Sequence, residues 1–351
     1  MSYLIIFIIV LFGATNAQGG VFPGKTEYSV MLRSTYDSNV LCYSSQDRDR
    51  ALNGTEKYQT PNSTLDDLRT DSRFTLVHRF KMMDKFKGRF QTSLNLSNYL
   101  NSQLNNAKWV SITYKQDVHN KFSVLYNYFY EPKYFIRDYS DVHTNERHHA
   151  EFALGKTVAK LYYRPNKTYE LVVAGELKKY AYNKYFTEYD GDRFGIKGEC
   201  IFRGKPWRAS VSYGYGEFDN SGFIRNSSEQ SIELIDDTET GESDYQEDMY
   251  SLSLEYSHKL FSKRTRTKIQ FSAADRHYQT TRLPDIDPIH HARRDVVSNT
   301  TIKSSMRISK QIDFQIGGSF IHRDSKASDP MVDRIKTYSR TLGWIELSYE
   351  L

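Results

Sequence analysis

Charged side chains recur at alternate positions through much of this sequence, and that spacing is the first indication of its chemistry. Arg89 and Gln91, for example, alternate with Phe90, Thr92 and Leu94. Because a β-strand turns successive side chains to opposite faces, such a stretch has one polar and one apolar face. The polar faces are rich in Lys and Arg, which attract anions. The basic residues that we expect on these faces are Arg73, Arg79, Arg89, Lys115, Lys121, Arg193, Lys197, Arg208, Lys268, Lys303 and Arg307.

Carboxylates share these polar faces but are fewer than the basic residues. An excess of cations predicts a basic passage if the polar faces line a water-filled interior. The alternative is an interior plugged by Arg–carboxylate networks or by an inward-folded loop. The acidic residues that we expect on these faces are Glu170, Glu176, Glu199, Glu255, Asp313 and Glu346.

The sequence offers no set of side chains at the spacing that catalysis or metal binding requires. The pairs His148-His149 and His290-His291 lack a second pair at metal-ligand spacing, so we expect exposed loop histidines there. The acidic run 236–244 lacks the glycine-punctuated loop of a calcium site and favours a solvated loop. Ser, His and acidic residues are scattered without a nucleophile motif. No catalytic residue, metal ligand or cofactor is therefore predicted.

The apolar faces carry almost no charge over four or five alternating positions, as in Tyr250, Leu252, Leu254 and Tyr256. That length is sufficient to cross the hydrocarbon core of an outer membrane. Aromatic residues make up 14% of the chain, with 27 Tyr. Tyrosines at the ends of apolar faces suit the boundary between lipid and water. The residues predicted at this boundary are Tyr114, Tyr126, Tyr130, Tyr213, Tyr256 and Tyr349.

About fourteen strands can be traced, from a first strand predicted at 27–41, and short turns alternate strictly with long loops such as 131–147. Short periplasmic turns and long extracellular loops are typical of membrane β-barrels, whereas a soluble sandwich has no reason to sort its connections. A sheet in lipid must close on itself to pair its backbone groups. The sequence therefore predicts a single-domain, all-β, antiparallel transmembrane β-barrel. One strand, 148–163, changes phase near Lys156, where we expect a bulge.

The N-terminal residues have the pattern of a secretory signal peptide. Leu4–Gly13 is apolar but too short to span a bilayer as a helix, and small residues follow to Ala17. We expect cleavage after Ala17, with 18–351 forming the barrel; a short N-terminal anchor is the alternative. The net charge of +5 contains no Lys/Arg block, so nucleic-acid binding is not indicated. Cys42 and Cys200 are the only cysteines and are expected to be unpaired.

The end of the chain carries one further pattern. One face of the final strand is formed by Thr341, Gly343, Ile345, Leu347, Tyr349 and Leu351. This segment resembles the closing strand of bacterial outer-membrane, porin-like β-barrels. Tyr349 matches the aromatic residue near the terminus, while Leu351 departs from the usual terminal aromatic. The resemblance implies a Gram-negative outer membrane, contact with its lipid and lipopolysaccharide, and recognition of the final strand by the barrel-assembly machinery. An amphipathic final strand of a soluble β domain is the alternative.

A lumen of about fourteen strands is intermediate between the filled interior of eight strands and the water channel of sixteen. The sequence therefore predicts a porin-like channel for passive passage of small polar or anionic solutes through a basic lumen. Two other functions stay open. One is a structural or adhesion barrel, or the sheath of a larger envelope complex. The other is an outer-membrane barrel enzyme of the lipase or protease type.

Overall fold

The computed structural model describes residues 24–54, 64–82, 86–141, 146–226 and 242–351, so the predicted signal peptide and most of the acidic run lie outside it. The strands are β1 (Gly24–Asp37), β2 (Asp67–Met82), β3 (Phe86–Tyr99), β4 (Ala107–His119), β5 (Phe122–Ser140), β6 (Arg147–Tyr163), β7 (Tyr169–Tyr182), β8 (Gly191–Gly204), β9 (Trp207–Asp219), β10 (Tyr245–Leu260), β11 (Lys263–Tyr278), β12 (Arg294–Arg307), β13 (Ile312–Lys326) and β14 (Tyr338–Glu350). The helices are α2 (Ser45–Leu52), α3 (Ser221–Asn226) and α4 (Pro330–Lys336), with single 3-10 turns η2 (Gln103–Asn105) and η3 (Thr187–Tyr189).

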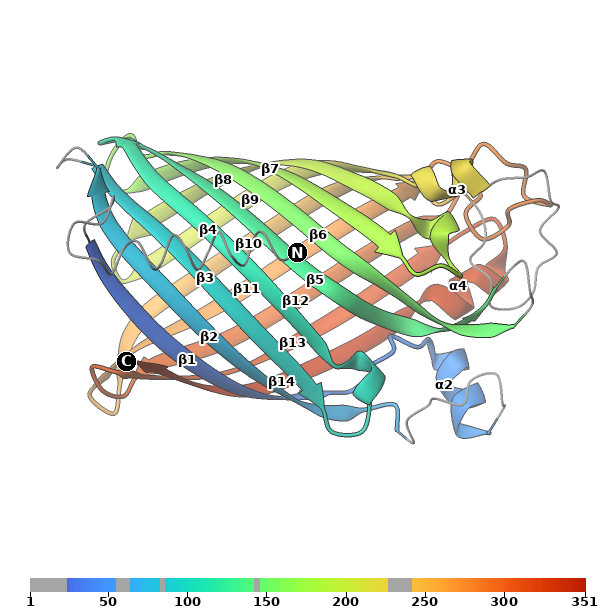
Figure 1. The fold of residues 1–351 in the computed structure, drawn as a ribbon, viewed down its shortest axis with the longest axis horizontal. Coiled ribbons are helices and arrows are strands. Elements are labelled where there is room, and N and C mark those ends of the chain that lie inside the picture. Colours follow the sequence, from blue (N-terminus) through green and yellow to red (C-terminus); the bar gives the residue numbers. More distant parts are fainter. Residues whose placement is uncertain (1–23, 55–63, 83–85, 142–145, 227–241) are drawn as a thin grey trace.

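The strands form one closed sheet (Figure 1). Each strand pairs antiparallel with its neighbours in sequence, and β1 also pairs with β14, where Leu32 lies opposite Leu347. The backbone N–H of Leu351 donates to the carbonyl of Tyr28 at 2.9 Å and extends this seam to the last residue. Closure leaves no sheet edge, as a sheet in lipid requires. The predicted antiparallel barrel of about fourteen strands is confirmed.

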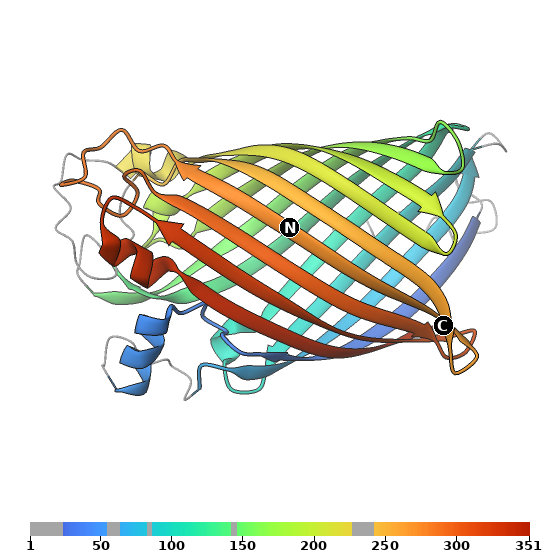
Figure 2. The ribbon, with the colours of Figure 1, turned by 180° about the vertical axis from the view of Figure 1, so that it is seen from behind.

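The two ends of the barrel differ. The C-terminus lies at the end where the connections are short, such as 205–206 and 261–262 (Figures 1 and 2). Helices α2, α3 and α4 lie at the opposite end, within the long connections. We call these the short-turn end and the long-loop end. The strict alternation of short and long connections that the sequence predicted is confirmed.

The outer surface of the barrel is apolar. Leu32, Val211 and Leu252 are 56%, 57% and 59% exposed. Val211 lies opposite Leu252 on one side and Cys200 on the other, so neighbouring strands turn their apolar faces the same way. A soluble protein would cover such a continuous surface, whereas a bilayer provides the cover itself.

The register and alternation place all the predicted boundary tyrosines on this outer face. Tyr114 lies opposite Tyr126, Tyr213 opposite Tyr250, and Tyr349 opposite the outward-facing Val30. Their location at the boundary between lipid and water stays a prediction. None of the described helices has both the length and the apolar composition needed to cross a membrane.

Buried apolar clusters are small and lie near the long loops. One contains Leu41, Tyr43 and Phe135, and another contains Tyr139 and Phe186. The interior of the barrel itself is lined with polar and charged groups. The fold therefore depends on its closed hydrogen-bond ladder and on polar contacts across the inner wall.

Several strand boundaries differ from the prediction. β5 continues to Ser140, so most of the loop predicted at 131–147 is strand, and β1 ends at Asp37 rather than at residue 41. Apolar residues continue into this part of β5, but two irregularities, between Glu131 and Tyr134 and between Phe135 and Arg137, break their alternation. A strand whose alternation changes phase is not recognised by a period of two residues.

The predicted bulge at Lys156 is also wrong. Lys156 pairs regularly with Phe129 and Lys178. The irregularities lie in the partner strand β5, between Glu131 and Tyr134 and again shortly after it. A break in one strand shifts the pairing of its neighbour, and a single sequence cannot say which of the two contains the extra residue.

Candidate functional site: the lumen

The inner wall carries the basic residues predicted on the polar faces. Arg73 lines a cavity in the long-loop half, Arg79, Arg89 and Lys115 line one at the short-turn end, and Arg307 lines a third. Five further basic residues alternate with exposed apolar residues on their strands and therefore face the lumen: Arg193, Lys197, Arg208, Lys268 and Lys303. Lys121 differs, because it lies in the turn between β4 and β5, at the rim of the barrel. That these groups act on a solute stays a prediction.

The predicted acidic residues share this inner face. Glu170, Glu176, Asp313 and Glu346 each form an ion pair with an arginine. Glu199 and Glu255 are turned inward by the same alternation but have no ion pair among the described residues. These two carboxylates lie toward the short-turn end of β8 and β10.

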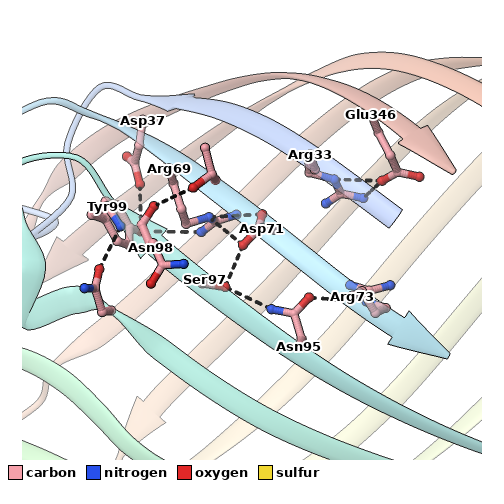
Figure 3. Close-up of polar contacts among 12 residues, drawn as sticks. Arg33, Asp37, Arg69, Asp71, Arg73, Asn95, Ser97, Asn98, Tyr99 and Glu346 are labelled. Carbon is pink, nitrogen blue, oxygen red and sulfur yellow. Dashed lines mark hydrogen bonds and ion pairs between the residues drawn. The ribbon is translucent and has the colours of Figure 1, made fainter. Parts of the chain in front are cut away.

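In the long-loop half, arginines and carboxylates are paired (Figure 3). Asp37 is fully buried and accepts from Nε of Arg340 at 2.9 Å and from the hydroxyl of Tyr99 at 3.5 Å. Arg69 donates from Nε to Oδ2 of Asp71 at 3.2 Å. Partners this close neutralise the guanidinium charges and fix their positions.

Further polar contacts lie toward the middle of the lumen (Figure 3). Arg33 donates from Nε to Glu346 across the β1–β14 seam at 2.8 Å. Arg73 donates to the Asn95 side-chain oxygen at 3.4 Å and lies 5.0 Å from the ring centroid of Trp109. Arg73 therefore combines a neutral acceptor with a cation–π contact.

On β8, Arg193 is buried to 2% exposure. It donates to Glu247 from Nε and to Glu176 from Nη1, both at 2.7 Å, and Arg276 donates to the other oxygen of Glu247 at 2.7 Å. A Cβ at Gly216 would lie 2.6 Å from Nη2 of Arg193. The glycine therefore makes room for the guanidinium to lie against the wall.

Another buried group of ion pairs surrounds Asp295. Arg293 and Arg323 both donate to Oδ2 of Asp295, at 3.0 and 2.5 Å. Ion pairs this deeply buried are costly to break, because the remaining charge loses both its partner and its water.

The prediction that the paired histidines are exposed loop residues is wrong. His290 is 1% exposed and lies 3.0 Å from the Asp287 carboxylate, and the first pair lies within β6. His149, on β6, is half exposed and lies 2.5 Å from Asp138. Asp287 lies only three residues before His290 in the sequence, whereas Asp138 meets His149 through the pairing of β5 with β6. Within the described ranges, no group of three or more His, Cys, Asp or Glu side chains could hold a metal ion.

Neutral polar side chains also line part of the inner wall between the two ends. Hydroxyl pairs bridge adjacent strands, with Thr75 and Ser93 3.0 Å apart and Ser210 and Ser253 2.9 Å apart. Such groups exchange hydrogen bonds readily with water and polar solutes.

The short-turn end has a different electrostatic character. Arg79 lies directly opposite Arg89, and Arg89 lies opposite Lys115, so three adjacent strands place like charges in one row. Lys81 and Lys87 form a second row beside it. These five side chains border a cavity of about 720 Å³. Like charges directly opposite one another destabilise a sheet.

The opposite side of the short-turn end repeats this pattern. Lys268 lies opposite Lys303, and Arg203 lies opposite Arg208. Arg203 donates to Glu170 at 2.7 Å, whereas the other three have no carboxylate within ion-pair distance in the described part of the chain. The uncompensated charge of the lumen is therefore concentrated at this end.

The sequence reading missed most of the buried network at the long-loop end. The residues of this network that were not among those predicted to line the lumen are Asp37, Arg69, Asp295, Arg323 and Arg340. The recurrence of Arg69, Asp71 and Arg73 at every second position was a usable signal, because charges can alternate as apolar residues do.

A closed barrel with an apolar outside, a charged inside and sorted connections needs a bilayer around it. The chain has the fold of a porin-like, outer-membrane β-barrel. The short-turn end of a porin-like barrel faces the periplasm and the long-loop end faces outward.

No protein-family model matches the chain, and no curated protein matches it. Among solved structures, the porin-like barrel is similar to an anion-selective porin from Comamonas acidovorans, with 10% identity over 93% of this chain and 99% of that one, at a TM-score of 0.45. It is also similar to the outer-membrane channel DcaP of Acinetobacter baumannii, with 9% identity over 93% and 96% and a TM-score of 0.47. OprD of Pseudomonas aeruginosa has 9% identity over 96% and 97%, at 0.42.

Proposed function

We propose that the protein is an outer-membrane channel through which small polar or anionic solutes pass by diffusion. The closed wall separates a polar interior from an apolar exterior, which is the arrangement that a water-filled passage through lipid needs. Cavities of about 330 and 720 Å³ lie against the inner wall in its long-loop half and at its short-turn end.

The observation that carries the proposal is the excess of cations at the short-turn end. Lys81, Lys87 and Arg89 are exposed, and the described residues provide them with no carboxylate partner. Cations that line a low-dielectric wall raise the local concentration of anions. The preference for anions is therefore expected to arise at the periplasmic mouth of the lumen.

Reversal potential in planar bilayers tests this function. The purified protein is inserted between two KCl solutions of different concentration, and we expect a stable conductance with a reversal potential of the sign that chloride flow gives. A preference for potassium, or no conductance from correctly folded protein, would contradict the proposed channel.

We also propose that the final strand is the segment that the barrel-assembly machinery recognises, and that the outer face contacts lipid and lipopolysaccharide. Ile345 and Leu347 of β14 are 53% and 47% exposed on the outer face, beside Tyr349. Before β14 pairs with β1, one edge of this strand has unpaired backbone N–H and C=O groups. A strand of the assembly machinery could form hydrogen bonds with them.

A further inference from the structure

We propose that the short-turn end of the lumen contains a binding site for the phosphate group, built by Arg79, Lys81, Lys87, Arg89 and Lys115. This inference rests on the proposed channel function and names the class of solute that the channel would bind. The site lies on the inner faces of β2, β3 and β4, close to the turns that join them.

The register of the sheet brings these cations together. Arg79, Arg89 and Lys115 lie directly opposite one another on three adjacent strands, and Lys81 lies opposite Lys87 one step nearer the turn. Opposed side chains on neighbouring strands have Cβ atoms only about 5 Å apart. Each such contact between like charges destabilises the empty sheet, and an anion bound between them would reverse the sign of that interaction.

Most of these cations have no carboxylate partner among the described residues. Arg79 is paired with Glu27, and Lys115 lies 4.4 Å from the ring centroid of Tyr162. In the described part of the chain, Lys81, Lys87, Arg89 and Lys115 have no carboxylate within 4.0 Å.

The cavity that these residues border is also basic at its edge. Arg164 adds a sixth basic residue, already bound to Glu170, while Asp117 is the only carboxylate among the described residues that line the cavity. The cavity volume of about 720 Å³ leaves room for a phosphate ester as well as for the free ion. The net positive charge around this cavity is therefore available to a ligand.

Phosphate matches this arrangement better than a monovalent ion does. It carries up to two charges at neutral pH and has several oxygens that accept hydrogen bonds from different donors at once. Arginine presents two parallel N–H groups to such an oxyanion, and lysine adds a mobile point charge. Chloride can satisfy only part of this set and is expected to pass through rather than stay bound.

Calorimetric titration with inorganic phosphate tests the site directly, on the whole barrel in detergent. We expect saturable binding, and the double variant Lys87→Gln, Arg89→Gln is expected to bind at least about tenfold more weakly, because two charge-assisted contacts are lost. Lys326→Gln is the matched control, since it removes one charge at the exposed end of β13 and should bind as the unsubstituted protein does. Heat-modified gel migration verifies that each barrel is closed.

Conductance measurements separate this inference from the channel itself. Phosphate added at the periplasmic side should reduce chloride current in a saturable way, and a phosphate monoester should do the same if the whole cavity is accessible. Anion-selective current without phosphate binding would overturn the site and leave the channel function standing. Phosphate binding in a cation-selective barrel would support the site and overturn the proposed function. Equal binding by the double variant would overturn the site.

Discussion

Arg193 and Arg89 lie on the inner wall of the same barrel, but their surroundings are opposite. Arg193 is buried at 2% exposure and is held by Glu176 and Glu247. Arg89 is exposed, lies between Arg79 and Lys115, and donates to the Gln91 side chain, with no carboxylate partner in the part of the chain that the structure describes. The long-loop half is thus rich in neutralised, fixed charges, whereas most of the described cations without a carboxylate partner lie at the short-turn end.

The difference separates two roles that one kind of side chain can have in a lumen. A buried guanidinium with two carboxylates joins β8 to β7 and β10, and the field that it presents to a solute is largely cancelled. A guanidinium among like charges weakens the sheet slightly but leaves its charge available to an anion. The sequence predicted a basic lumen without distinguishing its two ends, whereas the described residues place most of the uncompensated cations at the short-turn end.

The largest effect is expected at Glu247. The substitution Glu247→Gln removes the charge that Arg193 and Arg276 share, and breaking a buried ion pair costs about 3–5 kcal/mol. Urea unfolding in detergent should show a loss of this size in the unfolding free energy. The matched variant Glu255→Gln, on the same strand without an ion pair among the described residues, should change it by less than about 1 kcal/mol. Equal losses would remove the distinction between the two regions.

An intermediate effect is expected from reversing charge at the short-turn end. Lys268→Glu combined with Lys303→Glu replaces an opposed cation pair by carboxylates. We expect the chloride-to-potassium permeability ratio to fall by about tenfold, since the focused field in this region changes sign. Reversal potentials measure it, with the exposed Lys326→Glu as the control. An unchanged ratio would mean that the free cations do not control which ions pass.

The smallest effect is a gain in stability. Arg89→Gln relieves repulsion with Arg79 and Lys115, and we expect the unfolding free energy to rise by about 0.2–1 kcal/mol. The gain should shrink in high salt, which screens exposed charges over a few ångströms. A loss of stability comparable to that of Glu247→Gln would show that Arg89 has a structural role after all.

The sequence by itself determined the architecture. Alternation is a local property with a period of two residues, so Val211 and Tyr213 could be assigned to the outer face and Arg208 to the inner face without coordinates. The lengths of turns and loops are also local properties. They predicted the approximate number of strands and that short turns lie at one end of the barrel and long loops at the other. The bulge in β5 and the continuation of that strand to Ser140 were not readable in this way, because the irregularities break the alternation there.

Only the tertiary structure decided which charges are free. Arg340 and Asp37 are 303 residues apart in sequence and meet because β14 closes on β1, while Arg193 reaches Glu247 past the glycine of the strand between them. These ion pairs depend on the register of every strand pair around the closed barrel and on the curvature of its wall. A shift of one residue in the register would change the partners of the charged side chains. The local sequence determines the type of each side chain and the face of the strand on which it lies. Whether its charge is neutralised depends on residues from distant strands, which come into contact only when the barrel closes.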